Sequence, residues 1–115
     1  MAEGSIRRAL EAERAAASSR VRTLGAELDG MIADAVDTNA DDEHDPEGST
    51  VAYERAQVTA LLAEARSRLG EADQALSRLA EGRYATCEAC GGIIPAERLA
   101  ALPATRTCVG CAAVG

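Results

Sequence analysis

Aromatic residues are almost missing from this sequence. Its 115 residues include two tyrosines, no tryptophan and no phenylalanine. Because aromatic side chains supply much of the bulk of most globular cores, a conventional globular core is excluded. Alanine is the most frequent residue, and arginine, glutamate and leucine follow. This composition is typical of long helices that pack closely against each other.

Lysine is also missing, and all twelve cationic residues are arginines. The formal net charge is −7, and nearly all of it lies in the middle of the chain. Residues 34–54 contain eight carboxylates and no cation, whereas residues 1–33 have net charge 0 and residues 55–115 have net charge +1. Because no basic stripe is available to displace counterions from phosphates, direct binding to nucleic acid is not expected.

Long apolar runs are missing too. None approaches the roughly 20 residues that a membrane span needs, and the first residues, MAEGSIRRALEAE, lack the apolar core of a signal peptide. We therefore predict a cytoplasmic protein with no membrane partner. Structural disulfides are rare in the cytoplasm, so the cysteines are expected to bind a metal ion.

Apolar residues repeat with heptad spacing in two segments of nearly equal length. The first segment runs from about Glu3 to Asp37 and the second from about Thr50 to Glu81. Their spacings of three, four and seven residues are the a/d pattern of a coiled coil. The predicted seam residues are Ile6, Leu10, Ala17, Val21, Leu24, Leu28, Met31 and Ala35 in the first segment, and Val51, Val58, Leu61, Ala65, Leu69, Ala72, Leu76 and Leu79 in the second.

An acidic loop, at about residues 38–50, separates the two segments. Pro46 and Gly48 are expected to interrupt the helix there, and Ser49 or Thr50 can cap the second helix. Two equal seams joined by a short polar loop predict an all-α fold built on a long antiparallel helical hairpin. The alternative is one long helix that dimerises with a second chain, and Pro46 within the loop argues against it.

All four cysteines lie in two Cys-x2-Cys pairs, Cys87 with Cys90 and Cys108 with Cys111, which are separated by 17 residues. This spacing is typical of a structural zinc site in which four thiolates form a tetrahedron. Two redox-active pairs are the alternative, but no βαβ pattern surrounds them. A catalytic zinc ion would need an open coordination position, and four thiolates leave none. We therefore predict one structural Zn²⁺ ion.

The predicted domains are a coiled-coil hairpin over residues 1–81 and a zinc finger over residues 82–115. Within the finger, a short helix is expected over residues 96–102, with Pro95 at its start and Pro103 beyond its end. Four thiolates around Zn²⁺ carry a net negative charge, which nearby cations are expected to offset. The candidate cations are Arg83, Arg98 and Arg106.

Catalytic activity is not expected. The chain has one histidine, His44, and no Ser or Cys nucleophile that it could activate in a cleft. Two long helices and a small finger also form no large pocket. We predict that the protein is not an enzyme, and we assign no catalytic residue.

The segment from residue 82 to residue 111 resembles the four-cysteine zinc finger of the DksA/TraR family of bacterial transcription regulators. The predicted hairpin before it is similar to the architecture of that family, so the resemblance covers most of the chain. The matching positions are Gly82, Tyr84, Cys87, Cys90, Gly91, Ile94, Pro95, Arg98, Leu99, Ala101, Pro103, Cys108 and Cys111.

The resemblance implies a function and a partner. Members of the family bind RNA polymerase without binding DNA. Their coiled coil enters the secondary channel, and acidic residues at its tip approach the catalytic centre and alter the stability of open complexes. A carboxylate cluster in such a channel could meet arginine and lysine side chains or a Mg²⁺ ion. The resemblance therefore makes RNA polymerase the expected protein partner.

The tip of the best-studied family members reads Asp-x-x-Asp-x-Ala. Asp42 and Asp45 supply two acids in this spacing, but Glu47 stands in the place of the alanine. Asp34 and Asp37 have the same spacing, but they precede the turn. The resemblance thus assigns the partner-binding tip to Asp42 and Asp45.

The sequence also departs from the longer members of the family. It ends four residues after Cys111, without the C-terminal helix that some members place against polymerase. It has no lysine to match those that bind the alarmone ppGpp, so the resemblance does not extend to ppGpp sensing. These departures leave one alternative function open, a zinc-finger adaptor with the same fold that binds another protein and has no polymerase activity.

Overall fold

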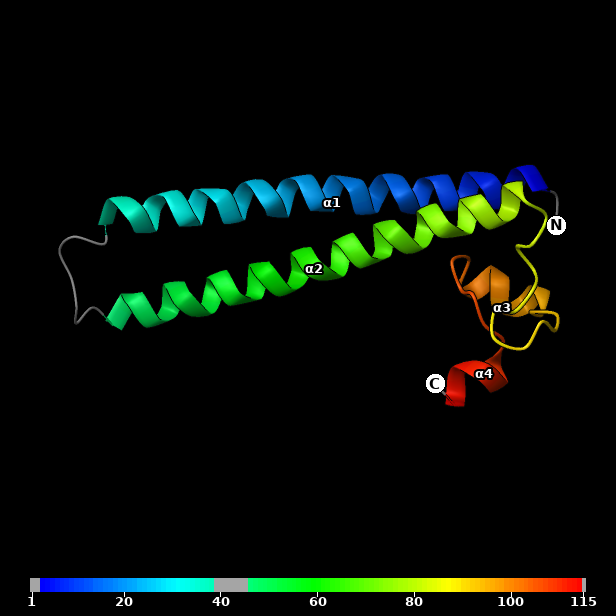
Figure 1. Ribbon diagram of the computed structural model, residues 1–115. Coiled ribbons are helices and arrows are strands. Elements are labelled where there is room, and N and C mark those ends of the chain that lie inside the picture. Colours follow the sequence, from blue (N-terminus) through cyan, green and yellow to red (C-terminus); the bar gives the residue numbers. More distant parts are fainter. Residues whose placement is uncertain (1–2, 39–45, 115) are drawn as a thin grey trace. The chain divides into compact units, whose positions relative to one another are not determined.

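Two long helices and a small C-terminal finger make up the described part of the protein. The computed structural model describes residues 3–38 and 46–114. Its helices are α1 (Glu3–Thr38), α2 (Pro46–Ala80), α3 (Ala96–Ala101) and α4 (Val109–Val114), and α1 and α2 run antiparallel (Figure 1). The described residues form no strand, although an isolated antiparallel bridge joins Thr86 and Ile93. The predicted all-α fold, a helical hairpin followed by a four-cysteine finger, is confirmed.

The contacts divide the chain into two compact units. The central unit consists of residues 17–67, and the terminal unit consists of residues 1–16 and 68–115. The finger therefore shares its unit with parts of both long helices. The predicted division into a hairpin domain and a finger domain, with its boundary after residue 81, stays a prediction.

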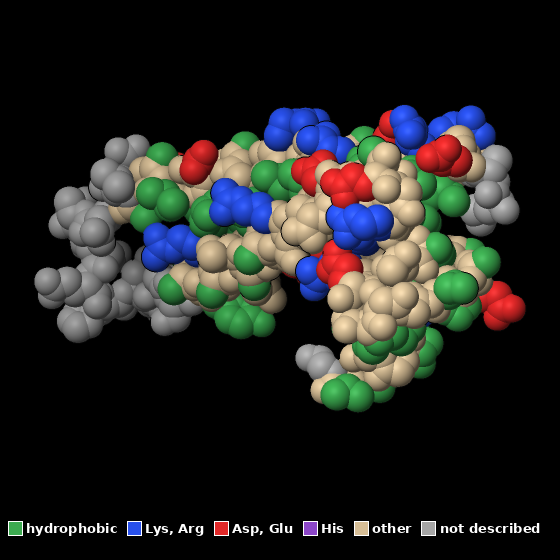
Figure 2. Space-filling model, turned by 45° about the vertical axis from the view of Figure 1, so that its right-hand side comes forward, with side chains coloured by type: hydrophobic (Ala, Val, Ile, Leu, Met, Phe, Trp, Pro, Cys, Tyr) green, Lys and Arg blue, Asp and Glu red, His purple; other side chains and the backbone are tan. Residues whose placement is uncertain are grey.

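Charged side chains of both signs are interspersed over the surface of the described helices. On the face drawn in Figure 2, arginine and acidic side chains both lie at the surface, and apolar side chains are exposed between them. In the described ranges, no helix has the length and apolar character that a membrane crossing requires.

The core of the central unit is a seam between α1 and α2. Its buried residues are Leu24 of α1 and Val58, Leu62 and Ala65 of α2, and further apolar residues of α1 pack against them. All eight predicted seam residues of α1 are buried or partly buried. The heptad prediction is therefore correct for α1.

The predicted seam of α2 is wrong at two positions. Leu61 is 41% exposed, whereas its neighbour Leu62 is 4% exposed and belongs to the core. With Leu62 in the seam, the spacings from Val58 to Leu79 alternate between four and three residues without a break. A coiled coil favours this alternation because its average of 3.5 residues keeps the seam on one side of the helix. Val51 is also exposed, and it is not part of the core cluster of the central unit.

The start of α2 also differs from the prediction. The helix begins at Pro46, so Gly48, Ser49 and Thr50 lie inside it, and neither Ser49 nor Thr50 is its cap. Proline suits the first position of a helix, because its φ angle is already helical and no N–H donor is needed there. Residues 39–45 of the predicted acidic loop lie outside the described residues.

The core of the terminal unit joins α1, α2 and the finger. Leu10 of α1, Ala75 and Leu79 of α2 and Tyr84 of the finger form its buried cluster. The hydroxyl group of Tyr84 donates a hydrogen bond of 2.7 Å to the carbonyl of Pro103, so this side chain is held at both its apolar and its polar end. The finger is thus packed on the helix ends through one aromatic anchor.

Gly82 ends α2 with a Schellman motif. Its φ angle is 75°, in the left-handed region. The N–H of Gly82 donates to the carbonyl of Leu79 (3.2 Å), and the N–H of Arg83 donates to the carbonyl of Arg78 (2.8 Å). These two bonds satisfy carbonyls at the helix end and turn the chain toward the finger.

The seam register can be tested with two neighbouring leucines. We expect Leu62→Ala to lower the free energy of unfolding by about 2 kcal/mol or more, because it removes a buried side chain and leaves a cavity. We expect the matched control Leu61→Ala to change it by less than about 0.5 kcal/mol, because that side chain is largely exposed. Urea unfolding followed by circular dichroism measures both values, and a larger loss for Leu61→Ala would contradict the register.

The position of the C-terminal end of α2 can be tested with two glycines, Gly82 at the helix end and Gly70 inside the helix. Gly82→Ala is expected to destabilise the protein by about 1 kcal/mol, because a Cβ atom is strained in the left-handed conformation. Gly70→Ala is expected to stabilise it by about 0.5–1 kcal/mol, because Gly70 lies inside the helix and a Cβ there meets no atom within 4 Å. Thermal unfolding of both variants measures the signs, and equal signs would refute the assigned helix end.

Candidate metal centre

Backbone hydrogen bonds fold the first cysteine pair into a tight turn. The N–H of Cys87 donates to the carbonyl of Gly92 (2.8 Å), and the N–H of Gly91 donates to the carbonyl of Cys87 (2.9 Å). Gly91 has a φ angle of 74°, which glycine adopts without strain. The N–H of Gly92 lies 3.4 Å from Cys90 Sγ, so the turn also provides a donor to a thiolate.

The second cysteine pair stands at the start of α4. Cys108 directly precedes this helix and Cys111 lies within it, and the carbonyl of Cys108 accepts a hydrogen bond of 3.0 Å from the N–H of Ala112. The N–H of Cys108 also donates to Cys87 Sγ, at 3.4 Å. A hydrogen bond therefore joins the second cysteine pair directly to the first.

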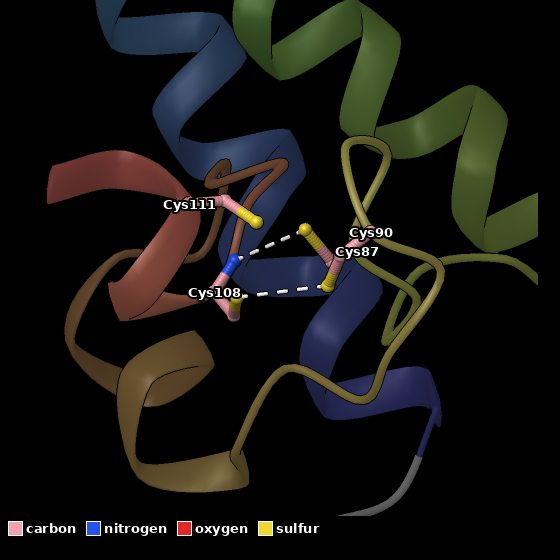
Figure 3. A group of neighbouring side chains, drawn as sticks. All are labelled: Cys87, Cys90, Cys108 and Cys111. Atoms are coloured by element: carbon pink, nitrogen blue, oxygen red, sulfur yellow. Dashed lines mark hydrogen bonds between the residues drawn. The ribbon is translucent and has the colours of Figure 1, made fainter. Parts of the chain in front are cut away.

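The four cysteine sulfurs come together in one cluster. Figure 3 shows the side chains pointing toward one another, and all four Sγ atoms lie within 4.8 Å of each other. The Sγ atoms of Cys90 and Cys108 are 3.9 Å apart. Zn–S bonds of about 2.3 Å place the sulfurs of a tetrahedral site about 3.8 Å apart, so the cluster fits zinc. The four thiolates hold a structural zinc ion, and such a site leaves no open position for catalysis.

Hydrogen bonds shift the pKa values of three of the four cysteine thiols in opposite directions. Backbone N–H groups, that of Cys108 first, lower the pKa of Cys87 to about 6, and the backbone N–H of Cys111 lowers the pKa of Cys108. Side-chain hydrogen bonding with Cys108 first, and then with Cys90 and Cys87, raises the pKa of Cys111 to about 12. Because zinc needs thiolates, its binding must release protons from this cluster.

The segment 105–107, which leads into Cys108, is held through all three of its backbone carbonyls. The carbonyl of Thr105 accepts a hydrogen bond from Arg78 Nη2 (3.2 Å). The carbonyl of Arg106 accepts one from the N–H of Glu88 (2.9 Å). The carbonyl of Thr107 accepts one from Arg98 Nε (2.8 Å). Since Glu88 follows the first ligand directly, its bond also joins the two cysteine pairs.

The cations around the site differ from those expected. Arg98 contacts the segment before Cys108 as described, but Arg83 pairs with Glu81 at the end of α2 instead. Sequence reasoning missed Arg78, whose side chain is almost completely buried. Its spacing carries no signal, because an arginine beside the seam of a coiled coil ordinarily reaches into solvent.

Asp42 and Asp45, the predicted tip residues, lie outside the described residues. Their assignment stays a prediction.

Comparisons with known proteins support the assignment of the C-terminal segment as a zinc finger. Residues 82–114 match the family described as prokaryotic dksA/traR C4-type zinc finger. An uncharacterised protein of Aquifex aeolicus (strain VF5) is 50% identical over 44 residues, which cover 38% of this chain and 30% of that protein. The uncharacterised protein YteA of Bacillus subtilis (strain 168) is 38% identical over 69 residues, which cover 60% of this chain and 29% of YteA. The chain therefore spans less than a third of the length of these relatives.

The fold is similar to that of a solved structure. Transcription factor DksA2 from Pseudomonas aeruginosa matches with a TM-score of 0.77, over 97% of this chain and 81% of that chain, at 22% sequence identity. At this low identity the likeness shows the fold, the helical hairpin with its C-terminal segment.

The metal centre can be tested by zinc content. We expect one Zn²⁺ per purified chain, and we expect Cys108→Ser to lose it during dialysis against a competing chelator, because three thiolates bind zinc far more weakly than four. Thr107→Ser, a neighbouring change that removes no ligand, is expected to keep its zinc. Elemental analysis gives the stoichiometry, and full retention of zinc by Cys108→Ser would contradict the assigned ligand set.

Proposed function

We propose that the chain is a transcription regulator of the DksA/TraR type that binds RNA polymerase in the cytoplasm, because residues 82–114 match the C4-type zinc finger of that family. The observation that carries the proposal is the combination of this finger, over residues 82–114, with the antiparallel hairpin fold of a DksA transcription factor. The role requires no catalytic residue and no direct contact with nucleic acid. The family is one of non-enzymatic regulators.

The proposed mechanism depends on the charge of the segment between the two seams. The hairpin enters the secondary channel of polymerase, and the finger packs on its base. Asp42 and Asp45 then act at the tip, where carboxylates attract arginine and lysine side chains or a Mg²⁺ ion of the partner. The charge pattern supports this, since the eight acids of residues 34–54 have no cation among them.

A second candidate is an adaptor that binds another protein through the finger. The finger exposes several large apolar side chains to solvent, as protein-binding surfaces commonly do. They are Ile93, Leu102, Val109 and Val114. This candidate keeps the fold and the zinc ion but has no effect on transcription.

Binding to RNA polymerase core of the source organism separates the two candidates. We expect the wild-type protein to bind and to change transcription from sensitive promoters in a purified system. We expect Asp42→Ala/Asp45→Ala to bind within about threefold of wild type but to lose the effect on transcription, because it keeps the hairpin and the finger and loses the tip charge.

The matched control is Asp34→Ala/Asp37→Ala, which removes the same charge in the same spacing before the turn. It is expected to retain the effect on transcription. A loss in both double variants would show that total charge matters rather than the tip. An absence of polymerase binding by the wild-type protein would refute the proposal and favour the adaptor.

A further inference from the structure

Arg78 occupies an unusual position for a charged side chain. It lies in the last turn of α2, and only 2% of its surface is exposed. Its Nη2 donates to the carbonyl of Thr105, a residue 27 positions later in the chain. Its Nη1 lies 3.5 Å from the carboxylate of Glu88, and its Nε and Nη1 make no hydrogen bond with the described residues. Burying a guanidinium whose N–H donors lack hydrogen-bond acceptors is costly.

Both polar contacts of the Arg78 side chain involve residues close in sequence to the metal ligands. Glu88 directly follows the ligand Cys87, and Thr105 begins the segment that leads into the ligand Cys108. Arg78 therefore contacts the neighbourhoods of both cysteine pairs from a single side chain.

Arg78 differs from the other two donors that hold segment 105–107. Arg98 and the N–H of Glu88 belong to the finger itself, whereas Arg78 belongs to the long helix α2. Of these three hydrogen bonds to the backbone carbonyls of the segment, the Arg78 bond alone joins the finger to the helix. The same residue accepts the Schellman hydrogen bond from Arg83 through its own carbonyl, so it takes part in the helix end with both its backbone and its side chain.

We propose that Arg78 is a positioning residue of the zinc centre, which couples occupancy of the four-cysteine site to the order of the last turns of α2. When zinc fixes Cys108, the carbonyl of Thr105 is held where Arg78 reaches it. When Arg78 is in place, the segment before Cys108 is preorganised for the metal ion. Coupling of this kind is reciprocal, so zinc stabilises the helix end as much as the helix end favours zinc binding. The proposal does not depend on polymerase binding.

The direct test is the zinc affinity of Arg78→Met, which keeps most of the apolar volume and removes the hydrogen bonds. We expect its affinity to fall by about tenfold, as is common when an outer contact of a metal ligand is lost. Competition with a chromophoric chelator measures this value. Arg78→Lys keeps the charge and one donor, and it is expected to recover part of the loss.

Two control variants separate positioning from general destabilisation. Leu79→Ala removes a buried neighbour from the same core cluster, and Arg83→Met removes an exposed cation from the same helix end. Both are expected to bind zinc within about threefold of wild type. If Leu79→Ala weakens zinc binding as much as Arg78→Met, or if Arg78→Met binds zinc like wild type, the proposal is wrong.

A spectroscopic measurement covers the case in which Arg78→Met folds poorly without metal. With Co²⁺ as the probe, thiolate-to-metal charge-transfer bands report the ligand geometry of the fully loaded protein. Arg78→Met is expected to shift these bands and Arg78→Lys to shift them less, whereas Leu79→Ala leaves them unchanged. Amide hydrogen exchange measures the other direction of the coupling, the effect of zinc on the helix end. Zinc is expected to protect the amides of the last turn of α2 in Leu79→Ala but not in Arg78→Met. Identical spectra and identical zinc-dependent protection in all variants would overturn the coupling.

Discussion

Coordination of zinc by four thiolates is the interaction on which the finger depends. Helices α3 and α4 have six residues each and contain no buried residue. Helices this short are not stable alone, and they bury too little apolar surface to be held by packing. The buried apolar contacts of the finger are limited to a few side chains, among them Tyr84 and Ile94. Metal binding must therefore supply most of the free energy that orders this segment, as it does in other small zinc domains.

The long helices were predictable because their heptad pattern extends over many turns, so single errors do not change the conclusion. The errors lie where the pattern is locally ambiguous. Leu61 and Leu62 are both apolar, and only the continuous alternation of the seam selects Leu62. Pro46 can interrupt a helix or begin one, and composition alone does not decide between them, because the outcome depends on whether helix precedes the proline.

The metal ligands were predictable for a different reason. Zinc prefers a defined set of donor atoms, and two Cys-x2-Cys pairs can satisfy it with little help from the rest of the chain. The support around the ligands was not predictable, because it depends on contacts that only folding brings about. Arg78 reaches Thr105 across 27 residues, and nothing in its local sequence distinguishes it from a solvent-facing arginine. Arg98 was predicted as a counter-charge, but the structure shows that it holds a backbone carbonyl.

The charge pattern places a constraint on function that neither the seam nor the zinc ion explains. Residues 1–33 are neutral in net charge and residues 55–115 carry +1, so the rest of the chain cannot neutralise the −8 of residues 34–54. Dense like charge destabilises a folded chain by self-repulsion, and a coiled coil or a finger could be built without it. The charge must be balanced by something outside the chain, either mobile ions or a cationic surface. A protein partner with a concave basic site gains most from such a segment, because a low-dielectric cleft strengthens each charge pair and excludes screening salt. The polymerase-binding role that we propose for the acidic segment would provide such a cationic surface.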